Sequence, residues 1–437
     1  MLVYCDHITP RVSYIFHFIL HTLCGLDYEL TSNEKDYREH QGVTLNYSHK
    51  HLREHDIEIT PNGLLSLKNI ISCQAQIEEE SKKVRLYIKA EGVNASIFDP
   101  FAAAFYLISR YEEYLGFTPD AHNRFEAAAS LLFKKKVLTR PLINEWAEEL
   151  KQTFSNTHTQ LYFRRNVFSF KLSIDVDQAF AFRYRGIVRN TTALVKNFMQ
   201  FNKPFLKNQW QTMVLQKRDA FDTFDYLRAC QQASGCSAIY FINAGAYSKF
   251  DKNLPVSHVH FKKVLNCIKQ FAEVGLHPSY FSDNQSDKLI EEKRALEAAI
   301  DKPVTQSRQH YLKLSFPQTY RQLLQAGITE DYSMGYASHP GFRAGTCTPF
   351  QWYDLGKEVA TSLMVYPITY MDGSFAEDLN LQPDEALNII KKLTDTVRRY
   401  NGTLIPIWHN HTVNDQFAWK GWKKVFEESL HYISKQA

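Results

Sequence analysis

Polar side chains follow predicted buried strands at four places in the carboxyl-terminal two-thirds of the chain. Residues 168–174 are rich in aromatic and aliphatic side chains, as a buried strand requires, and Asp175 and Asp177 follow them. In an extended chain, residues i and i+2 point to the same side, so both carboxylates can face one cation or ligand. An isolated Asp-x-Asp is more often a turn or a helix cap, and the other strand ends therefore decide between the two interpretations.

The other three strand ends carry imidazole and guanidinium groups. These residues are His277, then Arg308 and His310 on one segment, and finally His409. Because the carboxyl ends of parallel strands meet at one edge of a sheet, we expect these side chains to lie close together. A single histidine at a strand end usually serves a structural hydrogen bond, but Asp and His together are ligands that suit Zn²⁺ or another divalent cation. The pattern favours a catalytic metal centre.

Alternating strands and helices must position these residues. The predicted strands are 168–174, 237–244, 274–277, 305–312, 363–370 and 403–408. The predicted helices between them are 258–272, 286–300, 317–325 and 383–400. This order is typical of parallel α/β folds, and closure into a barrel is a compact way to arrange the strands. We therefore expect an α/β barrel domain over 166–437 with a helical insertion near 187–232, preceded by a small α/β (α+β) accessory domain over 1–160.

Length and composition limit the class of protein. A chain of 437 residues, with 44% hydrophobic and 22% charged residues, predicts two globular domains. A net charge of +4 is too small to indicate a nucleic-acid partner. The seven cysteines are scattered without a Cys-x-x-Cys pair, which argues against a disulfide framework and a cysteine zinc cluster. The chain shows neither a signal-peptide pattern nor an apolar run of about 18 residues, and a cytoplasmic location is expected.

The order and spacing of these motifs over roughly 166–435 resemble the polysaccharide deacetylase (NodB-like, carbohydrate esterase) family. The resemblance implies a distorted (β/α)7 barrel that holds a divalent metal, with Zn²⁺ favoured. Asp175 would be the general base and Asp177 a metal ligand, as in the Asp-x-Asp branch of the family. Arg308 would keep the base ionised and oriented, and His409 would protonate the leaving group.

One position departs from the family pattern. His277 matches the first histidine of the family's His-Ser/Thr-x-x-His motif, but Phe281 stands where the second should be. His310 is a physical candidate for the missing ligand, because a strand over 305–312 would turn His310 and Arg308 to the same side. The alternative is a site that no longer binds metal tightly.

The resemblance implies a metal-dependent hydrolase that removes an acyl group, in particular N-acetyl, from a bacterial surface or secondary carbohydrate. Two alternatives remain open. One is a catalytically degraded domain that binds a glycan or a protein partner, and the other is an amidase for a substrate that is not a sugar.

Two further regions could contact ligands. Asp331, Arg343 and Asp372 lie in predicted loops near the site, where they could bind substrate or form ordinary turns. The insertion near 187–232 is basic and aromatic. A helical cover over the barrel or a partner surface is the favoured interpretation, ahead of contact with an anionic membrane surface.

Overall fold

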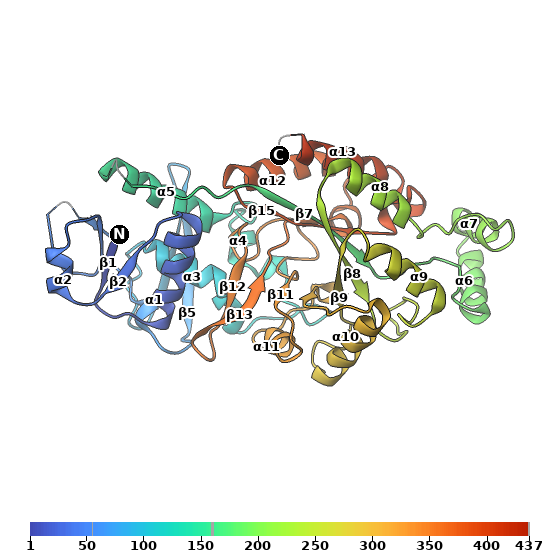
Figure 1. The fold of residues 1–437 in the computed structure, drawn as a ribbon, viewed down its shortest axis with the longest axis horizontal. Helices are drawn as coiled ribbons and strands as arrows, with labels where there is room; N and C mark the ends of the chain where they lie inside the picture. Colours follow the sequence, from blue (N-terminus) through green and yellow to red (C-terminus); the bar gives the residue numbers. More distant parts are fainter. Residues whose placement is uncertain (55, 159–160, 436–437) are drawn as a thin grey trace. The chain divides into compact units, whose positions relative to one another are not determined.

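The computed structural model describes residues 1–54, 56–158 and 161–435 and divides the chain into two units (Figure 1). Unit 1 comprises Met1–Phe168, Gly341–Pro367 and Thr396–Thr403. Unit 2 comprises the rest, namely Ser169–Pro340, Ile368–Asp395 and Leu404–Ala437. The sequence predicted an unbroken second domain over 166–437, and the structure differs because two stretches within that range belong to unit 1.

Unit 2 is built on seven parallel strands. In spatial order they are β11 (Glu330–Asp331), β10 (Gln306–Ser307), β9 (Glu273–His277), β8 (Ser237–Asn243), β7 (Ser169–Val176), β16 (Pro406–His409) and β14 (Tyr370–Met371). Each neighbouring pair is parallel. In the described part of the chain β11 and β14 do not pair with each other, so the expected closed barrel is replaced by an open, mixed α/β arrangement.

The central strands of unit 2 are apolar because helices and loops cover them. Leu172, Ile174 and Val176 of β7 are fully buried, and so are Ile239 to Ile242 of β8. The connecting helices are α8 (Phe224–Ser234), α9 (Val259–Ile268), α10 (Ser286–Ile300), α11 (Gln318–Gln325), α12 (Pro383–Arg399) and α13 (Trp422–Ser434). The predicted insertion therefore extends too far, since α8 buries Phe224 and Leu227 as an ordinary connecting helix does.

The segment that carries Arg308 and His310 is not the strand that the sequence predicted. β10 ends at Ser307, and His310–Leu312 forms a single 3-10 turn. Tyr311 and Leu312 have φ values of 59° and 52°, which a strand cannot accommodate. The alternation argument for His310 and Arg308 therefore does not apply here.

Unit 1 contains a parallel sheet and two antiparallel strand pairs. Its sheet has the order β2 (Glu29–Thr31), β1 (Leu2–Cys5), β3 (Thr44–Tyr47) and β4 (Ile57–Glu58). The antiparallel pairs are β5 (Cys73–Glu80) with β6 (Lys83–Ala90), and β12 (Phe350–Asp354) with β13 (Val359–Val365). β13 replaces the strand that was expected over 363–370.

The longer helices of unit 1 are α1 (Pro10–Phe16), α3 (Pro100–Ile108) and α5 (Leu142–Thr157). The sequence correctly places the start of α3, where Asp99 accepts hydrogen bonds from the backbone N–H groups of Phe101 and Ala102, both at 3.0 Å. Pro100 occupies the first turn, where its missing N–H is not needed. No helix in the described ranges combines the length and the apolar content that crossing a membrane requires.

Candidate metal centre

Strand register brings the predicted residues to one edge of the unit 2 sheet. His409 of β16 lies opposite Asp175 of β7, and Asn243 of β8 lies opposite His277 of β9. Asp177 follows β7 directly. Since all these strands are parallel, their carboxyl ends form one rim, and side chains from four neighbouring strands or loops meet there.

Asp177, His277 and His310 form a cluster whose donor atoms lie within 4.8 Å of one another. Oδ1 of Asp177 is 3.2 Å from Nε2 of His277 and 3.6 Å from Nε2 of His310. The two imidazoles are almost completely buried, whereas the Asp177 side chain keeps 21% of its surface exposed. The cluster thus opens toward solvent on the side of Asp177.

The Nδ1 atom of each imidazole makes a hydrogen bond to an acceptor of the protein, while its Nε2 atom faces Asp177. Nδ1 of His277 donates to the backbone carbonyl of Arg308 at 2.5 Å, and Nδ1 of His310 donates to Oδ1 of Asp251 at 2.9 Å. Because a carbonyl and a carboxylate only accept, both Nδ1 atoms carry a proton, and each Nε2, when it is deprotonated, directs its lone pair toward Asp177. This is the usual support for histidines that bind a metal.

Oδ1 of Asp177 is buried and accepts no hydrogen bond from any residue that the structure describes, although two imidazole nitrogens lie nearby. A buried carboxylate oxygen without a hydrogen-bond donor destabilises the folded protein unless a cation is bound there. One carboxylate oxygen and two Nε2 atoms form a three-ligand set that suits Zn²⁺ and leaves coordination positions for water and substrate. The residues present therefore fit a catalytic divalent cation.

The surrounding charges keep the carboxylates of this centre ionised. Burial alone would raise the pKa of Asp177, but His310, His277 and His409 together hold it well below its usual range. Burial also acts against ionisation of Asp251, yet the contacts with His310 and the backbone N–H of Tyr280 lower its pKa to about 2. Both carboxylates are therefore available as acceptors or ligands at neutral pH.

Asp175 is held by an ion pair with Arg308. Nη1 of Arg308 donates to Oδ1 of Asp175 at 2.7 Å, and Nη2 donates to Ser173 Oγ at 2.8 Å. Nε donates to the backbone carbonyl of Tyr332 at 2.9 Å. With all three nitrogens engaged, the guanidinium fixes the orientation of the Asp175 carboxylate. Oδ2 of Asp175 lies 3.8 Å from Nε2 of His277, at the border of the cluster.

The ring of Phe241 packs against one face of the Arg308 guanidinium. The Arg308 guanidinium lies over the ring of Phe241 at 4.3 Å from its centre. Gly275 of β9 leaves room for the ring, because a Cβ there would lie 2.5 Å from Cε1 of Phe241. A glycine in β9 thus helps to position the arginine that contacts Asp175.

The imidazole of His409, like that of His310, is held by a carboxylate, which in this case belongs to Asp372. Its Nδ1 donates to Oδ1 of Asp372 at 2.7 Å, while its backbone N–H and Thr412 Oγ1 donate to Oδ2 of Asp372. Burial alone would lower the pKa of His409, but Asp372 outweighs it, and Asp177 and Asp175 add to the effect, so that the pKa rises to about 10. The Nε2 of this imidazolium lies 3.7 Å from Oδ2 of Asp177.

The expected substrate contacts at Asp372, Asp331 and Arg343 are not supported. Asp372 is fully buried and serves His409. Asp331 is also fully buried, where it accepts hydrogen bonds from Tyr320 and Ser333. Arg343 belongs to unit 1, and its buried guanidinium donates to Glu113 at 3.0 and 2.6 Å. These three predictions fail because burial and protein partners leave the side chains unavailable to a ligand.

Two residues of the centre were missed. Asp251 lies in the loop after β8, and no sequence pattern marks it. Asn243 ends β8 as a polar residue on an apolar strand, which is the signal that identified the other sites. Its Nδ2 donates to Oδ1 of Asp251 at 3.2 Å, and it thereby helps to position the carboxylate that supports His310.

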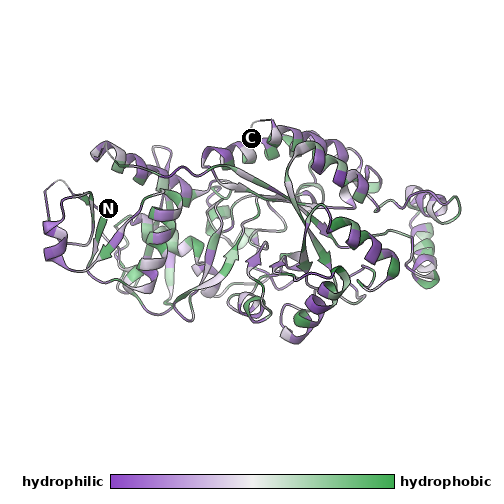
Figure 2. Cartoon of the chain, in the orientation of Figure 1, coloured by the Kyte–Doolittle hydropathy of each residue, from purple (hydrophilic) through white to green (hydrophobic). Residues whose placement is uncertain are grey.

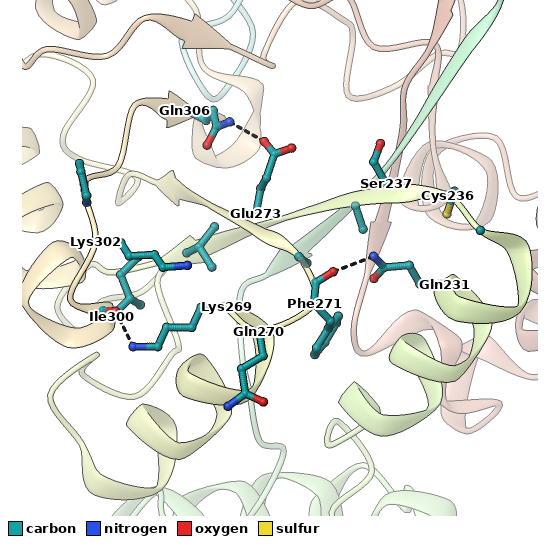
Figure 3. A pocket seen from close by; sticks show the side chains of 15 residues that line it. Gln231, Cys236, Ser237, Lys269, Gln270, Phe271, Glu273, Ile300, Lys302 and Gln306 are labelled. Carbon is teal, nitrogen blue, oxygen red and sulfur yellow. Dashed lines mark hydrogen bonds between the residues drawn. The ribbon is translucent and has the colours of Figure 1, made fainter.

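A pocket of about 660 Å³ lies at the opposite edge of the sheet, at the amino ends of β8 and β9 (Figure 3). Ser237 and Glu273, the first residues of these strands, help to line it. Its polar groups largely satisfy one another, since Gln306 donates to Glu273 at 2.5 Å and Lys269 donates to the carbonyl of Ile300 at 2.7 Å. The pocket carries no cluster comparable with the centre at the other edge.

Comparisons with known proteins give a family match for part of unit 1. Residues 1–159 match a model described as a family of unknown function, DUF7033. A search of curated proteins found no relative of the chain.

Solved structures that match part of this chain include polysaccharide deacetylases. A Mycobacterium smegmatis protein named as a candidate polysaccharide deacetylase is 11% identical, with a TM-score of 0.41 over 63% of this chain and 86% of that one. A polysaccharide deacetylase from Bacillus cereus is 10% identical, with a TM-score of 0.28 over 62% and 86%. A CE4-family pseudoenzyme from Bacillus anthracis is 12% identical, with a TM-score of 0.32 over 63% of each chain. At these values the likenesses carry no weight for function.

Proposed function

We propose that unit 2 is a metal-dependent hydrolase that removes an acyl group, in particular N-acetyl, from a carbohydrate. The observation that carries the proposal is the convergence of Asp177 Oδ1 with the Nε2 atoms of His277 and His310, whose Nδ1 atoms are held from behind. A carboxylate and an imidazolium border this cluster, as acyl hydrolysis requires. The motif order that resembles the polysaccharide deacetylases points to the same reaction.

The roles of the chain's own residues follow from their contacts. A divalent cation bound by Asp177, His277 and His310 would polarise the acyl oxygen and acidify a bound water. Asp175, oriented by Arg308, accepts the proton of the attacking water. His409, protonated at neutral pH, donates its Nε2 proton to the departing amine or alcohol, and Asp372 stabilises the imidazolium.

The proposal includes His310 as the substitute for the histidine that Phe281 replaces. The side chain of Phe281 is 43% exposed, and it packs on the ring of Tyr280 with 5.0 Å between the ring centres. Tyr280 in turn contacts Tyr311, whose ring is 4.7 Å from that of His310. The exposed ring of Phe281 offers an apolar face on which a sugar ring can pack, and this supports a carbohydrate substrate.

Metal analysis and an activity assay test the proposal together. We expect the purified full-length protein to bind close to one divalent cation and to release acetate from N-acetylated oligosaccharides. Asp177→Asn should abolish both, whereas Asp175→Asn should keep the metal and lose activity by about 100-fold or more. Asp287→Asn, an exposed carboxylate on α10, is the matched control and should change neither.

Two outcomes would contradict the proposal. If the wild-type protein neither contains nor takes up a divalent cation in a titration, the ligand assignment fails. If it binds metal and glycan but releases no acetate, unit 2 is a binding domain and the reaction assignment fails.

A further inference from the structure

Two helices of unit 2, α6 (Ile187–Met199) and α7 (Lys203–Met213), lie together away from the other helices of the unit (Figure 1). Both helices expose apolar side chains. They form one packed pair, called here the α6–α7 hairpin and defined as residues 183–218. The sequence favoured either a helical cover over the barrel or a partner surface for this insertion. The structure contradicts a cover, because no residue of α6 is buried.

The exposed apolar surface of the protein is concentrated on this hairpin. Of the twenty large apolar side chains that are exposed among the described residues, twelve belong to it. They are Tyr184, Ile187, Val188, Leu194, Val195, Phe198, Met199, Phe201, Trp210, Met213, Val214 and Leu215. Figure 2 shows this apolar character along α6. Such a concentration of exposed apolar side chains within one short segment is typical of an interaction site.

The helix α6 is amphipathic, but its polar face is turned inward. Its half-buried positions include Asn190 and Asn197. Asn190 Nδ2 donates to the backbone carbonyl of Phe182 at 2.9 Å, and Asn202 Nδ2 donates to Asn197 Oδ1 at 3.0 Å. Gln209 of α7 donates to the carbonyl of Asn190 at 2.9 Å. A water-exposed helix normally shows the reverse arrangement, so the outer face is built for a medium other than water.

The hairpin is also strongly basic. Residues 183–218 contain eight lysines and arginines and no aspartate or glutamate, whereas the whole chain has a net charge of only +4. The rest of the chain is therefore net negative, and the positive charge is localised here. Three of the arginines are half-buried. Arg218 pairs with Asp222 and Asp225, whereas the exposed lysines are Lys196, Lys203, Lys207 and Lys217.

We propose that the α6–α7 hairpin binds the surface of an anionic membrane, with its helices in the plane of the interface. Exposed Phe, Trp, Met and Val side chains would enter the boundary between headgroups and acyl chains, and the lysines would contact anionic headgroups. A protein partner or a second copy of the chain would match the apolar face but would not by itself account for eight basic residues without an acidic one. The proposal does not depend on the hydrolase assignment.

The position of the hairpin in the chain links it to the metal centre. Only residues 178–186 separate Asp177 from the start of α6. Phe205 of α7 packs on Phe182 in this connection, with 5.0 Å between the ring centres. The membrane-binding element therefore starts at the rim of the sheet that carries the centre.

Vesicle co-sedimentation of the full-length protein tests the proposal. We expect binding to vesicles of phosphatidylcholine with phosphatidylglycerol, little binding to phosphatidylcholine alone, and a decline in binding as salt is raised. Lys203→Glu with Lys207→Glu should weaken the binding by about tenfold or more, since each basic side chain near such a surface contributes several-fold. Phe198→Ser with Phe201→Ser should do the same by removing apolar insertion.

Matched variants control for general surface effects. Lys262→Glu with Lys263→Glu changes two exposed lysines of α9, and Tyr162→Ser with Val167→Ser changes two exposed apolar residues outside the hairpin. Both pairs should bind vesicles as the wild type does. No co-sedimentation with anionic vesicles at low salt would overturn the proposal, as would equal losses in the control variants. Concentration-dependent self-association without lipid binding, abolished by the Phe198 and Phe201 changes, would instead assign the face to a second copy.

Discussion

The candidate metal centre of unit 2 and an arginine–glutamate cluster of unit 1 are both buried groups of charges, yet their hydrogen bonding differs. In unit 1, Glu113 accepts from Nε of Arg110 at 2.8 Å and from Nε and Nη2 of Arg343 at 3.0 and 2.6 Å. Arg110 also donates to Glu112 at 2.8 Å. In unit 2, by contrast, Oδ1 of Asp177 faces two imidazoles and accepts from neither.

This difference separates a structural cluster from one that can take a ligand. The carboxylate of Glu113 is satisfied by donors that cannot lose their protons, and although burial alone would raise its pKa, Arg343 and Arg110 lower it. The imidazoles around Asp177 instead direct lone pairs at the space beside it. Burial and charge alone therefore do not identify a ligand-binding site. The directions in which the hydrogen-bond donors and lone pairs point distinguish it from a structural cluster.

The largest expected effect on stability is in unit 1. Glu113→Gln would leave two buried guanidinium groups without their shared counter-charge, and we expect the free energy of unfolding to fall by about 3–5 kcal/mol. Urea unfolding measures this change, while the metal content should stay unchanged. Glu39→Gln, which removes an exposed i,i+4 pair with Lys35, should have no measurable effect. A loss of metal in the Glu113 variant would show that the two clusters are not independent.

Replacing Asp372, whose carboxylate accepts a hydrogen bond from His409, should slow catalysis without changing metal binding. Asp372→Asn removes the charge that stabilises the imidazolium, and we expect kcat for deacetylation to fall by about 100-fold. Steady-state kinetics measures the decrease, and metal analysis should show unchanged occupancy. Thr412→Val removes only a hydroxyl that donates to Asp372, so its effect should be smaller. An unchanged kcat in Asp372→Asn would remove His409 from the proposed mechanism.

Replacing Asp251, whose carboxylate accepts a hydrogen bond from His310, should weaken metal binding. Asp251→Asn weakens the polarisation of the imidazole, and we expect the metal Kd to rise by about 10- to 100-fold. Competition with a chromophoric chelator measures it. Ser248→Ala, which removes a hydroxyl that donates to Asp251 Oδ2, should change Kd by much less. If metal affinity is unaffected in the Asp251 variant, His310 is not a ligand.

A further expected effect concerns the pH dependence of stability and the buried carboxyl of Asp331, which accepts hydrogen bonds from the hydroxyls of Tyr320 and Ser333. Burial raises the pKa of Asp331 to about 6, and hydrogen bonds from Ser333 and Tyr320 only partly offset this. The folded protein therefore holds this proton more tightly than the unfolded chain, so its contribution to stability is complete below about pH 4 and is lost as pH rises to about 6. Asp331→Asn should remove this loss, which is on the order of 3 kcal/mol. Urea unfolding at pH 4 and pH 7 measures it, and identical pH slopes in wild type and variant would contradict the assignment.

The positions of the chemistry-bearing side chains were readable from the sequence where they follow regular strands. Asp175, His277 and His409 lie at or next to the carboxyl ends of predicted strands, and parallel pairing brings them to one rim. The helix start at Asp99 was equally readable, because capping is a local property.

Features that depend on tertiary contacts could not be predicted from the sequence. His310 lies in the cluster, but through a turn with positive φ at Tyr311 rather than through strand alternation. Arg343 looked like a ligand-binding residue between two glycines, and only the fold shows Glu113 beside it. Asp251 lies in a loop, where no periodicity marks its side chain. Barrel closure was also not encoded locally, because it depends on whether the outermost strands meet.

The way the chain is divided between the units has a consequence for synthesis on the ribosome. Unit 1 begins at Met1 but includes Gly341–Pro367 and Thr396–Thr403, so it lacks β12, β13 and Arg343 until most of unit 2 has been translated. During that interval Glu113 and Arg110 cannot pair with Arg343, because Arg343 has not yet been synthesised. The amino-terminal segment therefore remains an incomplete domain on the ribosome. A gene fragment that ends at the family match, residue 159, would leave the segment permanently in this state.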